Sequence, residues 1–310
     1  MASSETRDNP IKGYCLILLA NVCFSIVYLV IKDVKPRMQF EQFVFYWFLC
    51  GSVYYLVPMI KAEEIRMLRI PRHLVPVSVL MGVFEIVATL LFFFTIRLMN
   101  PAVVSFYSNV SIVMTIAMGV AFLRERFTRL EAIGGVILGA GIILMTYKGG
   151  QTLLLGFVLI MMFSLLFSIN TVLMKVTLKE IHPIAFSTYR TFILFMVATA
   201  LFLLKGHKTI PQLSALVEIA IGSFLGPFAG VFLQVTGLQY VEASKASLIG
   251  ATRPLMVLAG CIVWLGQIPG IAQSIGGGIA LVGIELMLWG KFRLSRHETD
   301  TANRGKGTGR

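Results

Sequence analysis

The chain carries ten runs of mainly apolar residues, each close to the length that an α-helix needs to cross a bilayer. The hydrocarbon core of a bilayer is about 30 Å thick and requires about 20 apolar residues in helical form. Hydrophobic residues make up 57% of the 310 residues and charged ones only 14%, whereas soluble domains are about one quarter charged. The sequence therefore predicts an all-α integral membrane protein with ten transmembrane helices. The runs lie near 13–31, 40–60, 74–96, 101–123, 130–147, 152–174, 183–204, 216–238, 243–265 and 270–290.

The basic residues between these runs predict the orientation of the chain. Because the connections are short, successive helices must be antiparallel. Of the 27 Lys and Arg residues, 18 lie on the side that holds both termini, 7 lie on the other side, and Arg190 and Arg253 lie within runs. Lys and Arg accumulate on the cytoplasmic side of membrane proteins. We expect a multi-pass protein of the cell (inner) membrane with both termini cytoplasmic, and the net charge of +12 does not indicate nucleic-acid binding.

The two halves of the sequence resemble each other. Residues 13–47 match residues 156–190 at nine of 35 positions, and residues 123–147 match residues 265–289 at nine of 25. The offsets, 143 and 142 residues, are nearly equal although the two stretches lie far apart. We divide the chain into an N-terminal tail (1–12), a first five-helix repeat (13–147), a second five-helix repeat (156–290) and a basic C-terminal tail (291–310) that is expected to be solvated and mobile.

The odd number of helices in each repeat has a consequence for transport. A repeat that crosses the membrane five times delivers the second repeat to the opposite side, so the two copies are inverted in the bilayer. Inverted repeats that meet around a site at the bilayer midplane are a recurrent plan of secondary transporters, because exchanging the conformations of the halves exchanges the open side. The pattern therefore favours alternating access.

Several motifs resemble those of the EamA-type drug/metabolite transporter superfamily over residues 11–290. They are the turn Leu123–Arg126 followed by the pair Gly134 and Gly135, the segment Pro183–Arg190, and Pro254 in the ninth run. The sequence departs from the family pattern at Gln267, which replaces a glutamate, and at Phe40 and Trp47, which replace a proline and an arginine. The resemblance implies transport of amino acids or related metabolites, mostly export.

Charged residues within the runs are the first candidates for the site, because they are costly in a membrane and usually face a cavity or a partner. Glu85 lies in the middle of the third run, where a carboxylate suits proton coupling or recognition of an ammonium group. Arg253 lies deep in the ninth run and suits a substrate carboxylate. The alternative is a structural ion pair between Glu85 and Arg253. Arg190 is either a site residue or extends to the cytoplasmic interface, and Glu285 is expected at an interface or between helices.

Uncharged polar residues extend the candidate site. Asn109 and Tyr107 lie in a polar stretch of the fourth run, which the repeat offset aligns with Ala251 near Arg253. Both helices are therefore expected to line a cavity, although hydrogen bonds between helices explain single Asn residues equally well. Glycines spaced as Gly135 and Gly139 permit close helix packing, within the chain or between two copies in a homodimer.

Other functions fit the sequence less well. All four His residues lie at helix ends or in tails, the only Asp residues lie outside the runs, and no phosphate-binding loop or Cys/His cluster is present. No enzyme activity, metal or cofactor is expected, and no filter loop indicates a channel. We predict a secondary transporter that exports a small metabolite, an amino acid or a related amphipathic compound, coupled to protons or a counter-solute. A receptor or scaffold that transports nothing is the alternative.

Overall fold

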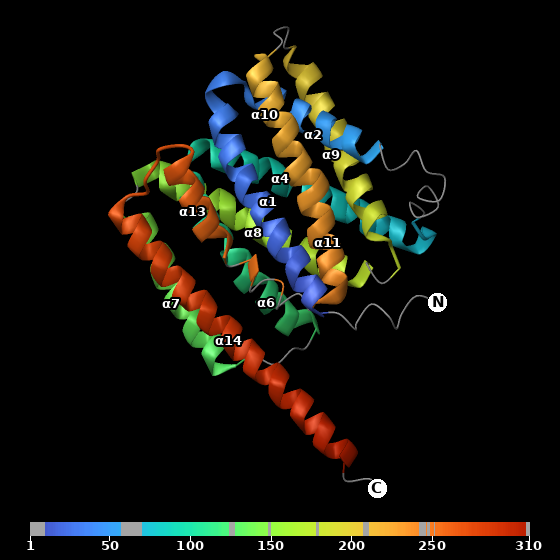
Figure 1. Cartoon of the computed structure of the whole chain (residues 1–310), viewed down its shortest axis with the longest axis vertical. Helices are drawn as coiled ribbons and strands as arrows, with labels where there is room; N and C mark the ends of the chain where they lie inside the picture. The colour runs from blue at the N-terminus through green and yellow to red at the C-terminus, as the bar shows by residue number, and fades with distance from the viewer. Residues whose placement is uncertain are drawn as a thin grey trace.

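The computed structural model describes residues 10–56, 70–123, 128–147, 150–177, 180–206, 211–241, 246, 249–250 and 252–307. These residues form helices joined by short connections, with no strand among them. The first half contains α1 (Pro10–Val34), α2 (Phe40–Leu56), α4 (Val75–Leu98), α5 (Pro101–Ser108), α6 (Val110–Leu123) and α7 (Arg129–Tyr147). The second half contains α8 (Gly150–Thr177), α9 (Pro183–Lys205), α10 (Leu213–Ser223), the π-helical segment η5 (Phe224–Gly230), α11 (Val231–Tyr240), α13 (Arg253–Val263) and α14 (Ile271–Gly307). Figure 1 shows their arrangement.

The lengths of the apolar helices confirm a multi-pass membrane protein. Among the described residues, five helices are long and apolar enough to cross a membrane: Ile11–Arg37, Arg72–Leu98, Leu154–Met174, Pro183–Lys205 and Leu213–Tyr240. The same part of the chain holds four shorter apolar helices: Pro101–Thr115, Ala132–Leu144, Arg253–Val263 and Ile271–Met287. The expected count of ten crossings stays a prediction, because these shorter helices do not by themselves reach the spanning length.

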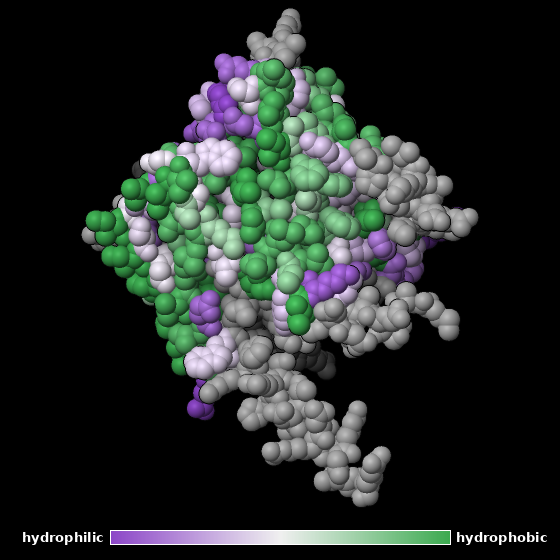
Figure 2. All heavy atoms as spheres, in the orientation of Figure 1, coloured by the Kyte–Doolittle hydropathy of each residue, from purple (hydrophilic) through white to green (hydrophobic). Residues whose placement is uncertain are grey.

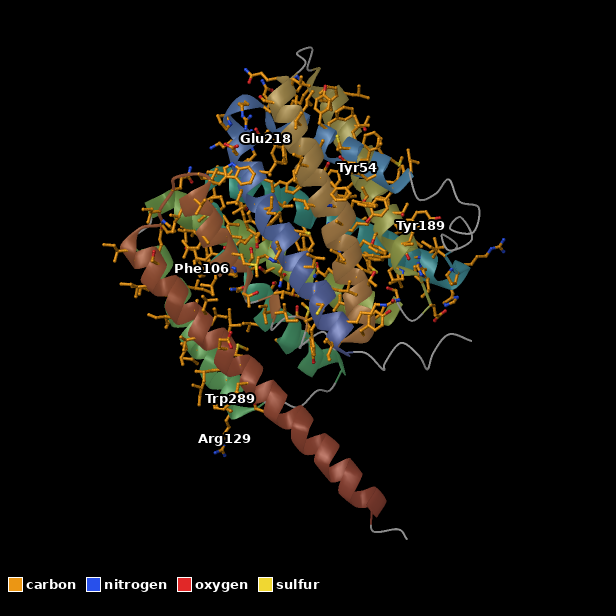
Figure 3. The ribbon with its side chains drawn as sticks, viewed as in Figure 1. Tyr54, Phe106, Arg129, Tyr189, Glu218 and Trp289 are labelled. Atoms are coloured by element: carbon orange, nitrogen blue, oxygen red, sulfur yellow. The ribbon has the colours of Figure 1, made fainter. Side chains whose placement is uncertain are left out.

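The outward-facing side chains are those of a protein surrounded by lipid. Leu204 is 84% exposed, Val263 87% and Val136 75%, although each carries a large apolar side chain. Apolar residues cover the middle of the face in Figure 2, and hydrophilic residues gather toward its two ends. Charged side chains lie in the same end regions in Figure 3, where Glu218 and Arg129 mark opposite ends of the bundle.

The two halves are interlocked rather than placed side by side. Helix α1 packs against α11 and α13, and its counterpart in the second half, α8, packs against α4 and α6. Under the repeat offset, α10, η5 and α11 together correspond to α4, and α13 corresponds to α6, so these contacts exchange when the halves exchange. The pairs α2–α9 and α7–α14 each join a helix to its own counterpart. Contacts of this kind are expected of two inverted copies.

The contact between α7 and α14 shows the relation between the two repeats in individual glycines. A Cβ added to Gly283 would lie 2.6 Å from the Gly134 carbonyl oxygen, and one added to Gly141 would lie 2.5 Å from the Gly276 oxygen. The offset of 142 residues relates Gly134 to Gly276 and Gly141 to Gly283. These glycines therefore serve close packing within the chain. Gly139, which the sequence suggested for such packing, has nothing within 4 Å of its added Cβ.

Most of the C-terminal tail is helical. Helix α14 continues through residues 291–307, and Figure 1 shows this part extending beyond the rest of the bundle. The start of α1 faces the same lower part of the molecule as the end of α14. This region is called the terminal end below, and the opposite one, near the η2 turn (Lys35–Arg37), the distal end.

Candidate functional site

A cavity of about 200 Å³ lies between the two halves. Its lining comes from α1, α2, α4 and the α5–α6 pair of the first half, and from α8, α9, η5, α11 and α13 of the second. On α1 the lining runs from Ile17 to Tyr28, and on α8 from Phe163 to Met174. The α1 stretch is centred on the middle of its helix, and the α8 stretch extends from the middle of its helix toward the terminal end. The cavity therefore extends from mid-depth toward that end.

Aromatic side chains close the cavity toward the distal end. The Phe93 ring centroid lies 5.3 Å from that of Phe43, 5.6 Å from Trp47 and 6.0 Å from Phe48. Trp47 is 1% exposed, and a Cβ added to Gly226 of η5 would lie 3.0 Å from its ring. Edge-to-face and stacked ring pairs of this kind are favourable. Trp47 joins this aromatic cluster to η5 of the second half.

Hydrogen bonds at the distal end, beyond the aromatic cluster, also join separate segments of the chain. Arg37 donates hydrogen bonds to both carboxylate oxygens of Glu218, at 2.7 and 2.5 Å, and thereby joins the first half to the second. Within the first half, Lys32 donates to the Met99 carbonyl oxygen at 2.5 Å. Together with the aromatic cluster, these contacts describe a conformation that is closed at the distal end.

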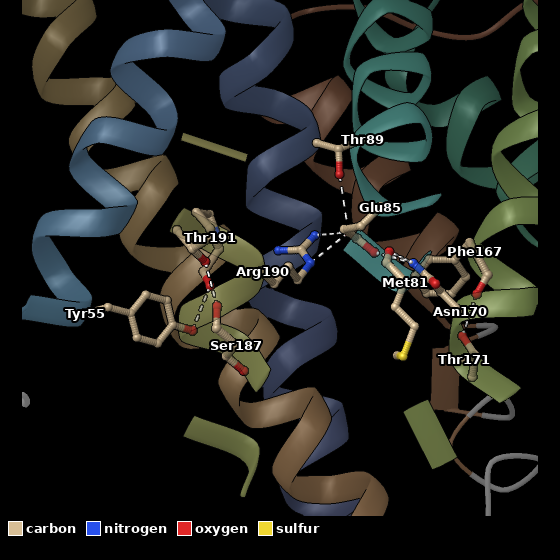
Figure 4. A network of polar contacts seen from close by, with 11 residues as sticks. Tyr55, Met81, Glu85, Thr89, Phe167, Asn170, Thr171, Ser187, Arg190 and Thr191 are labelled. Carbon is tan, nitrogen blue, oxygen red and sulfur yellow. Dashed lines mark hydrogen bonds and ion pairs between the residues drawn. The ribbon is translucent and has the colours of Figure 1, made fainter. Parts of the chain in front are cut away.

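Glu85 of α4 is the centre of a polar network in the cavity wall (Figure 4). Arg190 of α9 donates to Glu85 Oε1 from Nε at 2.7 Å and also from Nη2. Thr89 donates to Oε1 at 3.3 Å, and the Asn170 amide of α8 donates to Oε2 at 3.0 Å. Asn170 also donates to the Met81 carbonyl oxygen at 3.1 Å. Both carboxylate oxygens of Glu85 are therefore occupied by donors from three helices.

This network shows which arginine pairs with Glu85, a question that the sequence left open. Glu85 pairs with Arg190, and the alternative pair of Glu85 with Arg253 is not formed. The side chains of Arg190 and Glu85 are 18% and 14% exposed, so Arg190 does not extend to the cytoplasmic interface. Proximity of α4 and α9 across the halves produces the pair, and 105 residues separate its members in sequence.

Arg253 occupies a different part of the cavity wall. Its Nη2 and Nε donate to the Asn21 side-chain oxygen of α1 at 2.6 and 3.2 Å, and the guanidinium carbon lies 4.9 Å from the Phe24 ring centroid. The Asn21 amide in turn donates to the Ile249 carbonyl oxygen at 2.7 Å. Asn21 thus fixes the guanidinium relative to the chain immediately before α13.

The fourth helix of each repeat is interrupted beside the cavity. Asn109 separates α5 from α6, and α13 begins at Arg253 after the N-cap Thr252. Adding the repeat offsets to Asn109 leads to residues 251 and 252, so the interruptions are equivalent. Asn109 and Arg253 both line the cavity. Broken helices at the midplane are a feature of transporter binding sites.

The other predicted residues are placed as follows. Tyr107 is fully buried, packs against Phe157 with ring centroids 5.5 Å apart, and does not line the cavity. Glu285 lies on the exposed face of α14. Arg124, Glu125 and Arg126 of the predicted turn and Ala251 lie outside the described residues, as do the first nine residues of the N-terminal tail. Among the described residues no three His, Cys, Asp or Glu side chains gather to hold a metal ion.

Sequence reasoning missed several partners in the cavity wall. Asn21 and Asn170 are apparent in the sequence only as polar residues within apolar runs, without an indication of which arginine or carboxylate they contact. Thr89 and Tyr28 carry even weaker signals, because Thr and Tyr are common in membrane helices. A periodic search for polar residues on one helix face would find Glu85 with Thr89, four residues apart.

Comparison with known proteins identifies the family of this chain. The model of the EamA-like transporter family matches residues 11–147 and again residues 154–289. The chain belongs to the EamA-like transporter family. Its two matches coincide closely with the two repeats identified from the sequence, and the family consists of membrane transporters of small solutes rather than enzymes.

A solved crystal structure shares the fold of this EamA-like protein. It superposes with a TM-score of 0.68 at 15% sequence identity, over 91% of this chain and 98% of that chain. At this identity the likeness concerns the fold alone. A comparison with curated proteins finds no match.

Proposed function

We propose that this EamA-like protein is a secondary carrier that exports a small amphipathic metabolite, such as an amino acid, by alternating access between its inverted repeats. The observation that carries the proposal is the cavity between the halves, which holds charged and aromatic side chains and is closed at the distal end. A solute bound there contacts both halves. Movement of one half relative to the other therefore changes the side of the membrane from which the solute can be reached.

The repeat supplies a route between two conformations. Position 47 of the first half corresponds to position 190 of the second, so the Trp47 contact with η5 and the Arg190 contact with α4 are equivalent sites on opposite sides of the cavity. In the present conformation Trp47 is tightly packed, whereas Arg190 is held by Glu85. We infer that the carrier opens distally when the α2–η5 contact separates and the α4–α9 contact tightens.

The cytoplasmic termini predicted from the basic residues would direct the terminal end of the cavity to the cytoplasm. A carrier in this conformation would load solute from inside the cell, which supports export. In the absence of a nucleotide-binding motif in the sequence, the driving force would be a proton gradient or a counter-solute, and Glu85 is the one carboxylate among the described residues that line the cavity.

Counterflow in proteoliposomes tests the proposal. Vesicles loaded with an unlabelled metabolite should accumulate the same labelled metabolite with saturable kinetics, and a panel of amino acids and related acids and amines covers the predicted class. Glu85→Gln and Arg253→Ala should abolish the flux while the protein still elutes as a folded species in detergent. Arg72, exposed outside the cavity, offers the control substitution Arg72→Gln. Unimpaired flux in both cavity variants would exclude these residues from the site.

A further inference from the structure

The charges that face the cavity do not balance. Among its described lining residues only Glu85, Arg190 and Arg253 carry charge. Glu85 is paired with Arg190. The partners of Arg253 among the described residues are all uncharged: the Asn21 amide oxygen, the Tyr28 hydroxyl and the ring face of Phe24. One positive charge is therefore left without a carboxylate in this part of the chain. A buried charge is stable only when it is paired or well hydrogen-bonded. A bound anion would supply the charged partner that this guanidinium lacks.

Asn109 supplies a second, independent observation. It lines the cavity and is 5% exposed, and its amide nitrogen Nδ2 is buried without an acceptor among the described residues. A buried donor without a partner is rare and costly in folded proteins. The neighbouring Ser108 hydroxyl lies 3.2 Å from the Tyr28 hydroxyl, which in turn lies beside the Arg253 guanidinium. The unsatisfied donor and the cation without a carboxylate thus line the same cavity.

The helix that begins at Arg253 adds to the positive potential there. Helix α13 has 11 residues and starts beside the cavity, so the positive end of its dipole lies at the same place as the guanidinium. Helix N-termini favour anions, and discontinuous helices of transporters direct such ends at the anionic groups of substrates. Three features of different origin, a side-chain charge, an orphan donor and a helix end, all favour the same ligand chemistry.

We propose that Arg253, Asn109 and the start of α13 form a subsite for the carboxylate of the transported solute. The guanidinium would receive the carboxylate and the Asn109 amide would donate to it. Phe24, Phe163 and Phe167 would contact the apolar body of the solute. The inference rests on the proposed carrier function and specifies its substrate class: amphipathic carboxylates, including amino acids but excluding simple amines.

Charge-selective thiol labelling tests the subsite without any knowledge of the substrate. In a background with Cys15, Cys23, Cys50 and Cys261 changed to Ala, the substitution Gln234→Cys places one thiol on the cavity wall. The labelling rates of an anionic and a cationic methanethiosulfonate reagent are each divided by the rate with a free thiol in solution. We expect the anionic reagent to be favoured, and Arg253→Gln to lower the normalised ratio about tenfold, because one elementary charge changes the local potential.

Two further variants keep the test decisive. Arg72→Gln should leave the ratio unchanged, since Arg72 is exposed outside the cavity. If Arg253→Gln does not fold, Asn109→Asp should lower the ratio by adding a negative charge at the same place. A ratio that favours the cationic reagent, or one that neither Arg253→Gln nor Asn109→Asp changes, would overturn the subsite.

The counterflow panel separates this inference from the carrier proposal. Transport limited to solutes with a carboxylate supports both. Transport of amines alone overturns the subsite and leaves the carrier function standing. An anion-selective cavity in a protein that transports no member of the panel overturns the carrier function and leaves the anion subsite standing.

Discussion

The ion pair between Glu85 and Arg190 allows a quantitative test of the structure. Its side chains are 14% and 18% exposed, so both charges are largely removed from water. Removing one partner of a buried pair typically costs about 3–5 kcal/mol, because the other charge is left uncompensated. We expect Arg190→Gln and Glu85→Gln each to lower the free energy of unfolding by about 3 kcal/mol. The lower end of the range applies because the pair borders a cavity.

The double variant should be much less damaging than the two single ones together. With both groups neutral, no buried charge is left, and the loss should be about 2 kcal/mol, close to that of either single change. The coupling free energy from the double-mutant cycle should therefore be about 4 kcal/mol, above the about 0.5–3 kcal/mol typical of residues in one network, because each single change leaves a buried charge uncompensated.

Equilibrium unfolding in mixed detergent micelles, followed by tryptophan fluorescence and circular dichroism, measures these values. The Arg37–Glu218 pair provides a matched control in the same chain, since its side chains are 24% and 25% exposed. More exposed pairs contribute about 0–1 kcal/mol, so the cycle on Arg37→Gln and Glu218→Gln should give a coupling near 1 kcal/mol. A coupling below about 1 kcal/mol for Glu85 and Arg190 would refute the desolvated pair.

Four further substitutions have expected outcomes. Gly134→Leu should destabilise the protein by about 3 kcal/mol through overpacking against the α14 backbone. Gly139→Leu should be neutral, because a Cβ at this position has open space around it. Thermal unfolding of the two purified variants compares their stabilities. Trp47→Ala should cost about 3–5 kcal/mol by emptying a fully buried site, and equal thermal stability of variant and parent would contradict the packing of the distal aromatic cluster. Asn170→Leu should cost about 1–3 kcal/mol by removing the donor to Glu85 Oε2. Chemical denaturation measures this loss, and an unchanged free energy of unfolding would contradict the hydrogen bond.

Much of the candidate site could be anticipated because charge is rare in membrane helices. Glu85, Arg190 and Arg253 were singled out for this reason alone, and all three line the cavity. Asn109 was found because the repeat aligns its helix with that of Arg253. Tyr107 was included as a neighbour of Asn109 in sequence, but successive residues on a helix point about 100° apart. Its ring packs against α8 while the Asn109 side chain lines the cavity.

Pairing between helices could not be predicted in the same way. Glu85 and Arg190 are 105 residues apart and Arg253 and Asn21 are 232 apart, and nothing in the local sequence selects one arginine for the carboxylate. The interlocking of the halves selects it, because α4 meets α9 while α1 meets α13. The same arrangement assigns the glycines of α7 and α14 to a contact within the chain.

The amino-acid sequence alone is enough to establish a helical membrane protein that consists of two related halves. Hydrophobic run length and internal similarity are local properties, and lipid leaves few folds for runs of this kind, because every backbone polar group must be satisfied within a helix. Only the tertiary structure decided which charges neutralise each other and which remains available. That outcome depends on distances of a few ångströms between side chains from different helices, and it leaves Arg253, rather than Glu85, as the charge that faces the cavity without a charged partner.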